Sequence, residues 1–140
     1  MWLLYAFFSA IGAAAVAIFA KLGLQNIDST LATTVRAVIM ASFLVVVSIF
    51  LNKFKGFSLH SFSSREWLLI AAAGIAGALS WLFYFLAIKY GVTTGVVAVD
   101  RLSVVLVVLL AAIFLGEALS WLSVLGALMM TLGAILITLK

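Results

Sequence analysis

The sequence predicts an all-α membrane protein with five transmembrane helices. Hydrophobic residues make up 68% of its 140 residues and charged residues only 9%, whereas soluble domains average about 45–50% and about 25%. So short a chain has too few polar side chains to cover such an apolar core in water, and its solvent must therefore be lipid. The apolar runs are long and do not alternate, which favours helices that satisfy their own backbone in lipid over a barrel.

Five segments have about the 20 apolar residues that a spanning helix needs. They are Trp2–Ala20, Leu31–Leu51, Trp67–Ile88, Thr93–Leu115 and Leu119–Leu139. There is no proline and no Pro/Ser-rich linker, so we expect one domain over residues 1–140. The first span contains small residues like those of a signal-peptide cleavage site. However, no Lys or Arg precedes it, and we expect it to remain a span.

Several residues between or within the spans have expected structural roles. Asp28 precedes the second span and is a good N-cap. Glu117, before the fifth span, is expected to cap that helix, because a helix N-terminus favours a carboxylate. Gly77 in the third span, and Gly126 and Gly133 in the fifth, are expected helix-contact positions, since glycine allows close approach.

Basic residues in the connections are divided evenly between the two sides of the membrane. We call the side that holds the N-terminus side A and the other side B. Three basic residues lie on each: Lys53, Lys55 and Arg65 on side A, and Lys21, Lys89 and Lys140 on side B. Two arginines inside the side-B ends of spans change the balance to five against three. The positive-inside rule therefore specifies orientation only weakly. Either other features set a single orientation, or the chain inserts both ways and pairs antiparallel with itself.

Charged side chains inside spans are functional candidates, because lipid excludes them unless protein or water receives them. They are Arg36, Asp100 and Arg101. Arg36 and Asp100 both lie roughly 8–11 Å from the side-B boundary, and Arg36 is the expected partner of Asp100. Asp100 then either couples transport to a proton or an ion, or forms a structural ion pair that joins two helices. Arg101 is expected to extend its long side chain to side B.

Three of the four tryptophans fall at the side-A ends of spans, as an interfacial aromatic belt would place them, but Trp81 lies deep in the third span. Ser80, Trp81 and Tyr84 share a helical face with Gly77. This stripe predicts either a substrate cavity or ordinary helix packing.

Other classes of function are excluded by what the sequence lacks. Without cysteine there is no disulfide or thiolate metal site. The single histidine, His60, is expected to be an exposed loop residue. The net charge of +4 comes from scattered residues and indicates lipid contact, not nucleic acid. We therefore expect no metal, no cofactor and no enzymatic activity.

The sequence also resembles the EamA-type drug/metabolite transporter superfamily, specifically its short five-span bacterial and archaeal branch. The resemblance rests on Phe19–Arg36, Trp81–Gly91 and Val96–Gly133, and most specifically on the stretches VDRLSVV and LGE in the last of these. Family members often carry a proline before the acidic residue of the fourth span. Here that stretch reads Val97–Val99, which leaves no proline to kink the span.

The resemblance implies one half of a ten-helix inverted-repeat transporter fold. It suggests a secondary transporter for small metabolites, amino acids or drugs in the prokaryotic inner membrane, completed by a second, antiparallel copy. The alternatives are a half-transporter that needs a paralogous chain and a non-transporting accessory subunit. The expected pathway residues are Arg36, Ser80, Trp81, Tyr84, Asp100, Arg101 and Ser103.

Overall fold

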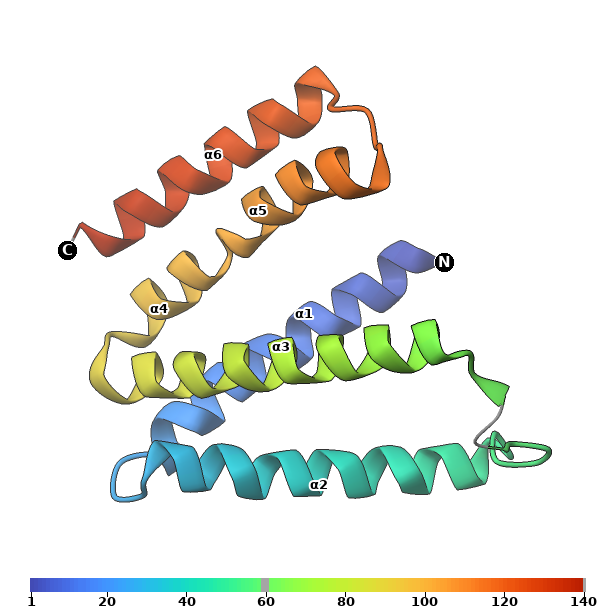
Figure 1. Cartoon of the computed structure of the whole chain (residues 1–140). Helices are drawn as coiled ribbons and strands as arrows, with labels where there is room; N and C mark the ends of the chain where they lie inside the picture. The colour runs from blue at the N-terminus through green and yellow to red at the C-terminus, as the bar shows by residue number, and fades with distance from the viewer. Residues whose placement is uncertain (59–60, 140) are drawn as a thin grey trace. The chain divides into compact units, whose positions relative to one another are not determined.

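The computed structural model describes residues 1–58 and 61–139, so the predicted loop residue His60 and the side-B residue Lys140 lie outside the described residues. Figure 1 shows helices joined by connections, and no strand is assigned among the described residues. The helices are α1 (Trp2–Gly23), α2 (Ser29–Phe50), α3 (Ser64–Tyr90), α4 (Thr93–Asp100), α5 (Ser103–Leu110), the π-helical turn η2 (Ala111–Leu115) and α6 (Trp121–Thr138).

The prediction of an all-helical membrane protein with five spans is confirmed. Within residues 1–58 and 61–139, five stretches are long and apolar enough to cross a membrane: α1, α2, α3, the α4–α5–η2 segment and α6. Their ends differ by up to three residues from the predicted ones. For example, α1 continues past Ala20 to Gly23 and α3 begins at Ser64 instead of Trp67, because helices can extend through polar end residues that an apolar run does not include.

Side-chain caps begin three of the helices. The Asp28 carboxylate accepts a hydrogen bond from the N–H of Leu31 (2.9 Å) and caps α2. Ser63 and Glu66 form a capping box at the start of α3: Glu66 Oε2 accepts from the Ser63 N–H (2.7 Å), and Ser63 Oγ accepts from the Glu66 N–H (3.3 Å). Each cap satisfies N–H groups that have no partner within the helix.

The predicted capping role of Glu117 is wrong. The cap of α6 is Ser120, whose side chain accepts a hydrogen bond from the N–H of Ser123 (3.0 Å). Glu117 lies in the connection before it and its N–H donates to the carbonyl of Ala111 (3.3 Å). That connection begins at Gly116, whose φ of +67° is a left-handed conformation that glycine adopts without a steric penalty.

The fourth span is not a continuous α-helix. It ends its first half at Asp100, turns through Arg101 and Leu102, and resumes at Ser103. The N–H groups of Leu102, Val104 and Val105 donate to carbonyls three residues earlier instead of four, which is the tighter 3₁₀ pattern. The sequence offered no proline for such an interruption, so a kink was not expected here.

Two compact units share the chain. Unit 1 comprises Met1–Leu22 and Tyr90–Lys140, and unit 2 comprises Gly23–Lys89. Within unit 1, α4 and α5 pack against α6, and the Lys21 ammonium donates to the carbonyl of Gly91 (2.9 Å). Within unit 2, the Lys89 ammonium donates to the carbonyl of Ile27 (3.1 Å) and thereby ties the end of α3 to the connection before α2.

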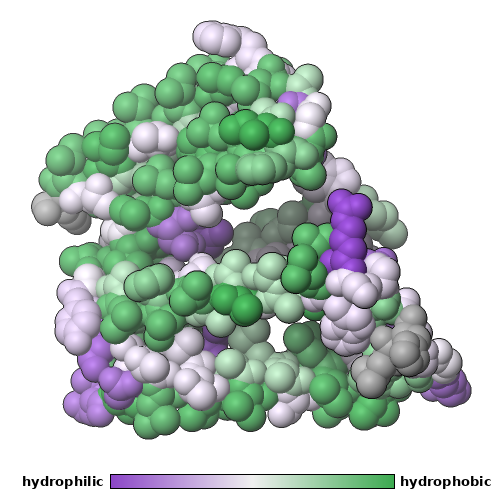
Figure 2. Space-filling view, viewed as in Figure 1, coloured by the Kyte–Doolittle hydropathy of each residue, from purple (hydrophilic) through white to green (hydrophobic). Residues whose placement is uncertain are grey.

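The exterior of the helices is strongly apolar. Large hydrophobic side chains are exposed along every span, among them Phe43 (66%) and Leu122 (77%). Figure 2 shows hydrophobic surface over most of the visible face. Among the described residues, the buried hydrophobic ones are few and mostly small, such as Ala17, Ala98 and Ala134. Lipid or another protein chain must therefore cover these helices, since water would not solvate them.

Candidate substrate and ion sites

In unit 2, the intramembrane arginine lies against an aromatic cluster on α3. The guanidinium carbon of Arg36 lies 3.7 Å from the centre of the Trp81 ring and 5.3 Å from that of Phe85. Trp81 and Phe85 are four residues apart and therefore on one face of α3. Both distances fall within the range of cation–π attraction, which is strongest for tryptophan.

The aromatic side chains of this cluster also contact one another. Trp81 meets Tyr84 edge to face, with ring centres 5.5 Å apart, and meets Phe85 at 5.9 Å. Phe85 is 4% exposed and Ile88, one turn further, is 0% exposed. The cluster therefore includes the buried residues Phe85 and Ile88, and this packing fixes the face of α3 against which Arg36 lies.

The neighbouring serine of the predicted stripe is placed differently. Ser80 is exposed, whereas Trp81 and Tyr84 are half-buried. The structure therefore brings Arg36, Trp81 and Tyr84 together in one unit and adds Phe85, which the sequence analysis missed. The sequence did indicate it, because Phe85 follows Trp81 by four residues, which places the two aromatic side chains one turn apart on the same face of the helix.

In unit 1, the intramembrane carboxylate marks the interruption of the fourth span. Asp100 is the last residue of α4 and is half-buried, Arg101 is exposed, and Ser103 is the first residue of α5 and is also exposed. Adjacent side chains on such a turn point in different directions, so Asp100 and Arg101 do not form a pair by being neighbours. The pairing of Asp100 with Arg36 would join the two units and stays a prediction.

The three glycines predicted at helix contacts have open surroundings. No described atom outside the local helix lies within 4 Å of a Cβ built at Gly77, Gly126 or Gly133. Gly95 on α4 does have a neighbour: the methyl group of Thr138 lies 3.5 Å from such a Cβ, an ordinary van der Waals distance. A contact of the three predicted glycines with a second chain stays a prediction.

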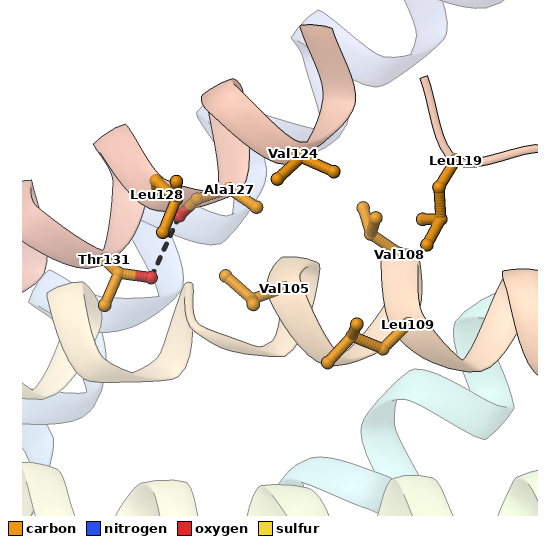
Figure 3. Close-up of a pocket in the computed structure, with 8 residues that line it drawn as sticks. All are labelled: Val105, Val108, Leu109, Leu119, Val124, Ala127, Leu128 and Thr131. Carbon is orange, nitrogen blue, oxygen red and sulfur yellow. Dashed lines mark hydrogen bonds between the residues drawn. The ribbon is translucent and has the colours of Figure 1, made fainter. Parts of the chain in front are cut away.

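A shallow groove of about 180 Å³ lies between α5 and α6 in unit 1. Figure 3 shows its walls, which are apolar except for Thr131, and the Thr131 hydroxyl already donates to the carbonyl of Ala127 (2.9 Å). A substrate site needs polar groups that fix orientation. This groove offers none and is instead suited to an apolar occupant.

No group of three or more potential metal ligands is found among residues 1–58 and 61–139. Unit 2 presents a cation held on aromatic rings, and unit 1 presents a carboxylate at a 3₁₀ turn, both inside apolar spans. Intramembrane charges of this kind mark the pathways of ions or substrates through helical membrane proteins. The fold and these residues therefore define a multi-pass membrane protein with transporter-like features.

Comparison with known proteins identifies the family. Residues 1–139 match the EamA-like transporter family, and the chain belongs to it. It is also 35% identical over 136 residues to an "Uncharacterized transporter in cobO 3'region" from Sinorhizobium sp.. The match covers 97% of this chain and 95% of that protein. No solved structure matches the chain.

Proposed function

We propose that the chain is a secondary transporter that works as an antiparallel homodimer in the prokaryotic inner membrane. Its substrates would be small metabolites, amino acids or drugs, which it exports or exchanges. The observation that carries this proposal is the number of spans. With five spans, the two ends of the chain lie on opposite sides of the membrane. A second copy in the inverted orientation would then supply the other half of an inverted-repeat transporter.

Three further observations support a second copy. The Sinorhizobium relative aligns over 95% of its own length, so that protein is about as long as a single five-span unit. The basic residues of the connections divide evenly between the two sides, which leaves the positive-inside rule little to act on. Exposed apolar helix faces, with open surroundings at Gly126 and Gly133, provide surface for the contact.

Within this proposal, Asp100 couples transport to a gradient. Asp100 lies beside a 3₁₀ turn in an apolar span, where the backbone hydrogen bonds depart from the α-helical pattern, and transporters hold coupling ions at discontinuous helices. Arg36, Trp81 and Tyr84 would form part of the substrate pathway on the other unit, with Ser80, Arg101 and Ser103 as further lining residues. A half-transporter completed by a paralogous chain, or an accessory subunit, would instead have one fixed orientation.

Single-cysteine labelling tests the orientation, since the native chain has no cysteine. Ser58→Cys reports the connection between α2 and α3, and Asn26→Cys reports the connection between α1 and α2 on the opposite side. Both residues are exposed. A membrane-impermeant thiol reagent is applied to intact cells, and again after permeabilisation.

Dual topology predicts that about half of each variant is labelled from outside, because the two orientations are equally populated. A single orientation predicts complementary results, with one site fully labelled from outside and the other not at all. The complementary result would eliminate the antiparallel homodimer. It would leave the half-transporter and the accessory subunit.

A further inference from the structure

We infer that Arg36, held on Trp81 and Phe85, is the binding site for the carboxylate group of an organic anion. This inference rests on the proposed transport function and names a substrate class for it. It concerns unit 2 alone, where the arginine and both rings lie.

The first step is the charge balance within unit 2. Its only carboxylates are Asp28 and Glu66, and each is engaged at the start of its own helix. Asp28 accepts from the N–H of Leu31, and Glu66 accepts from Ser63. Neither is available to Arg36, so the anion that neutralises this guanidinium comes from outside unit 2, either as the predicted partner Asp100 or as a bound substrate.

The second step is the depth of the charge. Arg36 lies seven residues after Ser29, the first residue of α2, which places it about 10 Å along the helix axis. It is half-buried among apolar neighbours. A guanidinium in such a place is costly without a counter-charge, and the cation–π attraction of about 1–2 kcal/mol offsets only part of that cost.

The third step is the geometry of the guanidinium. Its central carbon lies at van der Waals contact, 3.7 Å, over the face of Trp81. If an N–H of the guanidinium pointed at the Trp81 ring, the guanidinium carbon would lie farther from the ring. The guanidinium is therefore stacked on the ring face. The five N–H donors of arginine lie in the guanidinium plane, and stacking therefore leaves its edge open for a bidentate oxyanion.

Charge also selects among oxyanions. One guanidinium balances one negative charge, which a carboxylate carries. A phosphate monoester carries nearly two at neutral pH and would leave a net negative charge in the apolar span. The half-buried rings of Trp81 and Tyr84 beside the arginine add apolar surface, so an organic carboxylate fits better than a small inorganic ion.

The test uses four compounds that share a phenyl group: benzoate, benzamide, benzylamine and phenyl phosphate. Binding to the full-length protein in proteoliposomes is followed by Trp81 fluorescence after Trp2, Trp67 and Trp121 are replaced by Phe. We expect saturable binding of benzoate, with an affinity at least about tenfold higher than that for each of the other three compounds. Arg36→Gln should weaken benzoate binding at least about tenfold, because hydrogen bonds to a charged group are among the stronger ones.

Two matched variants make the result specific. Arg36→Lys keeps the charge but loses the planar fork, so its affinity for benzoate should fall between those of the wild type and Arg36→Gln. Arg65→Gln removes an exposed arginine at the N-terminal end of α3, far along the helix from Trp81 and Phe85. It should leave the benzoate response unchanged. Equal affinity for benzoate and benzamide, or unchanged benzoate binding in Arg36→Gln, would overturn the inference. Tighter binding of phenyl phosphate would overturn the carboxylate assignment.

Flux of the same labelled compounds separates this inference from the proposed function. If benzoate binds through Arg36 but no compound crosses the membrane, the inference stands and the transporter proposal fails. If benzamide or benzylamine is transported and Arg36→Gln has no effect, the transporter proposal stands and the inference fails.

Discussion

Two of the charged side chains inside the spans, Arg36 and Asp100, are accommodated in different ways. Arg36 lies on α2, a helix that continues without interruption from Ser29 to Phe50, and its charge rests on aromatic rings of α3. Asp100 lies where the fourth span stops being an α-helix. The comparison shows that an apolar segment can hold a cation by means of a neighbouring aromatic face. An anion cannot be held in that way, because the ring face is itself electron-rich.

A carboxylate needs hydrogen-bond donors or a cation instead. The interruption after Asp100 changes the backbone hydrogen bonds of Leu102, Val104 and Val105 to the shorter 3₁₀ pattern. Such bonds are weaker and easier to open than α-helical ones. The fourth span is therefore suited to rearrangement during transport, whereas α2 and α3 form a stable aromatic cluster. Three predictions test this distinction, and a fourth tests the helix caps.

The largest effect is expected at Asp100. Replacing Asp100 with Asn keeps its shape but removes the charge, and gradient-driven uptake in proteoliposomes should fall to the level of empty liposomes. Dimer formation, measured by cross-linking, should be retained. Glu117→Gln removes an exposed carboxylate in a connection and should leave uptake near the wild-type level. Wild-type uptake by Asp100→Asn would show that the broken helix does not carry a coupling site.

A smaller effect is expected when the aromatic support of Arg36 is removed. Trp81→Leu keeps an apolar side chain but loses a cation–π contact of about 1–2 kcal/mol, so the affinity for a transported anion should fall by roughly 5- to 30-fold. Apparent affinity from the concentration dependence of uptake measures this. Trp121→Leu, at the exposed start of α6, is the matched control. Equal losses in the two variants would mean that Trp81 has no specific relation to Arg36.

Hydrogen exchange should distinguish the two helices directly. Amides of Leu102, Val104 and Val105 should exchange roughly tenfold faster than amides in the middle of α2, because 3₁₀ hydrogen bonds open more readily. Exchange followed by mass spectrometry in lipid nanodiscs gives the rates of both segments in one sample. Uniform protection along residues 93–115 would indicate a continuous fourth helix and remove the contrast.

The smallest effects are expected at the caps that begin α3 and α6. Ser63→Ala and Ser120→Ala should each lower the free energy of unfolding by about 1 kcal/mol, because each leaves helix N–H groups without a side-chain acceptor. Thermal unfolding of the purified protein measures this. Ser42→Ala in the middle of α2 removes a hydroxyl that only donates back to the carbonyl of Val38 and should change stability less. A larger effect in Ser42→Ala would contradict the assigned caps.

Local signals explain which sequence predictions succeeded. The five spans follow from apolar length alone, because lipid permits only helices that satisfy their own backbone. Asp28 as a cap follows from its residue type and its place before an apolar run. Glu117 was misplaced because α6 begins four residues later, at Trp121, where Ser120 supplies the acceptor. Helix ends depend on hydrogen bonds among a few polar residues, and apolar counts do not resolve them.

The amino-acid sequence determined by itself that this chain lies in a membrane, how many times it crosses, and which charged residues lipid would otherwise exclude. Those properties depend on composition and on the length of apolar runs, which are local. Only the tertiary structure decided that Arg36 lies on Trp81 and Phe85, and that the fourth span breaks after Asp100. The first is a contact between residues far apart in the chain. The second is a choice between two backbone hydrogen-bond patterns whose free energies are close, so packing against a neighbouring helix can decide it.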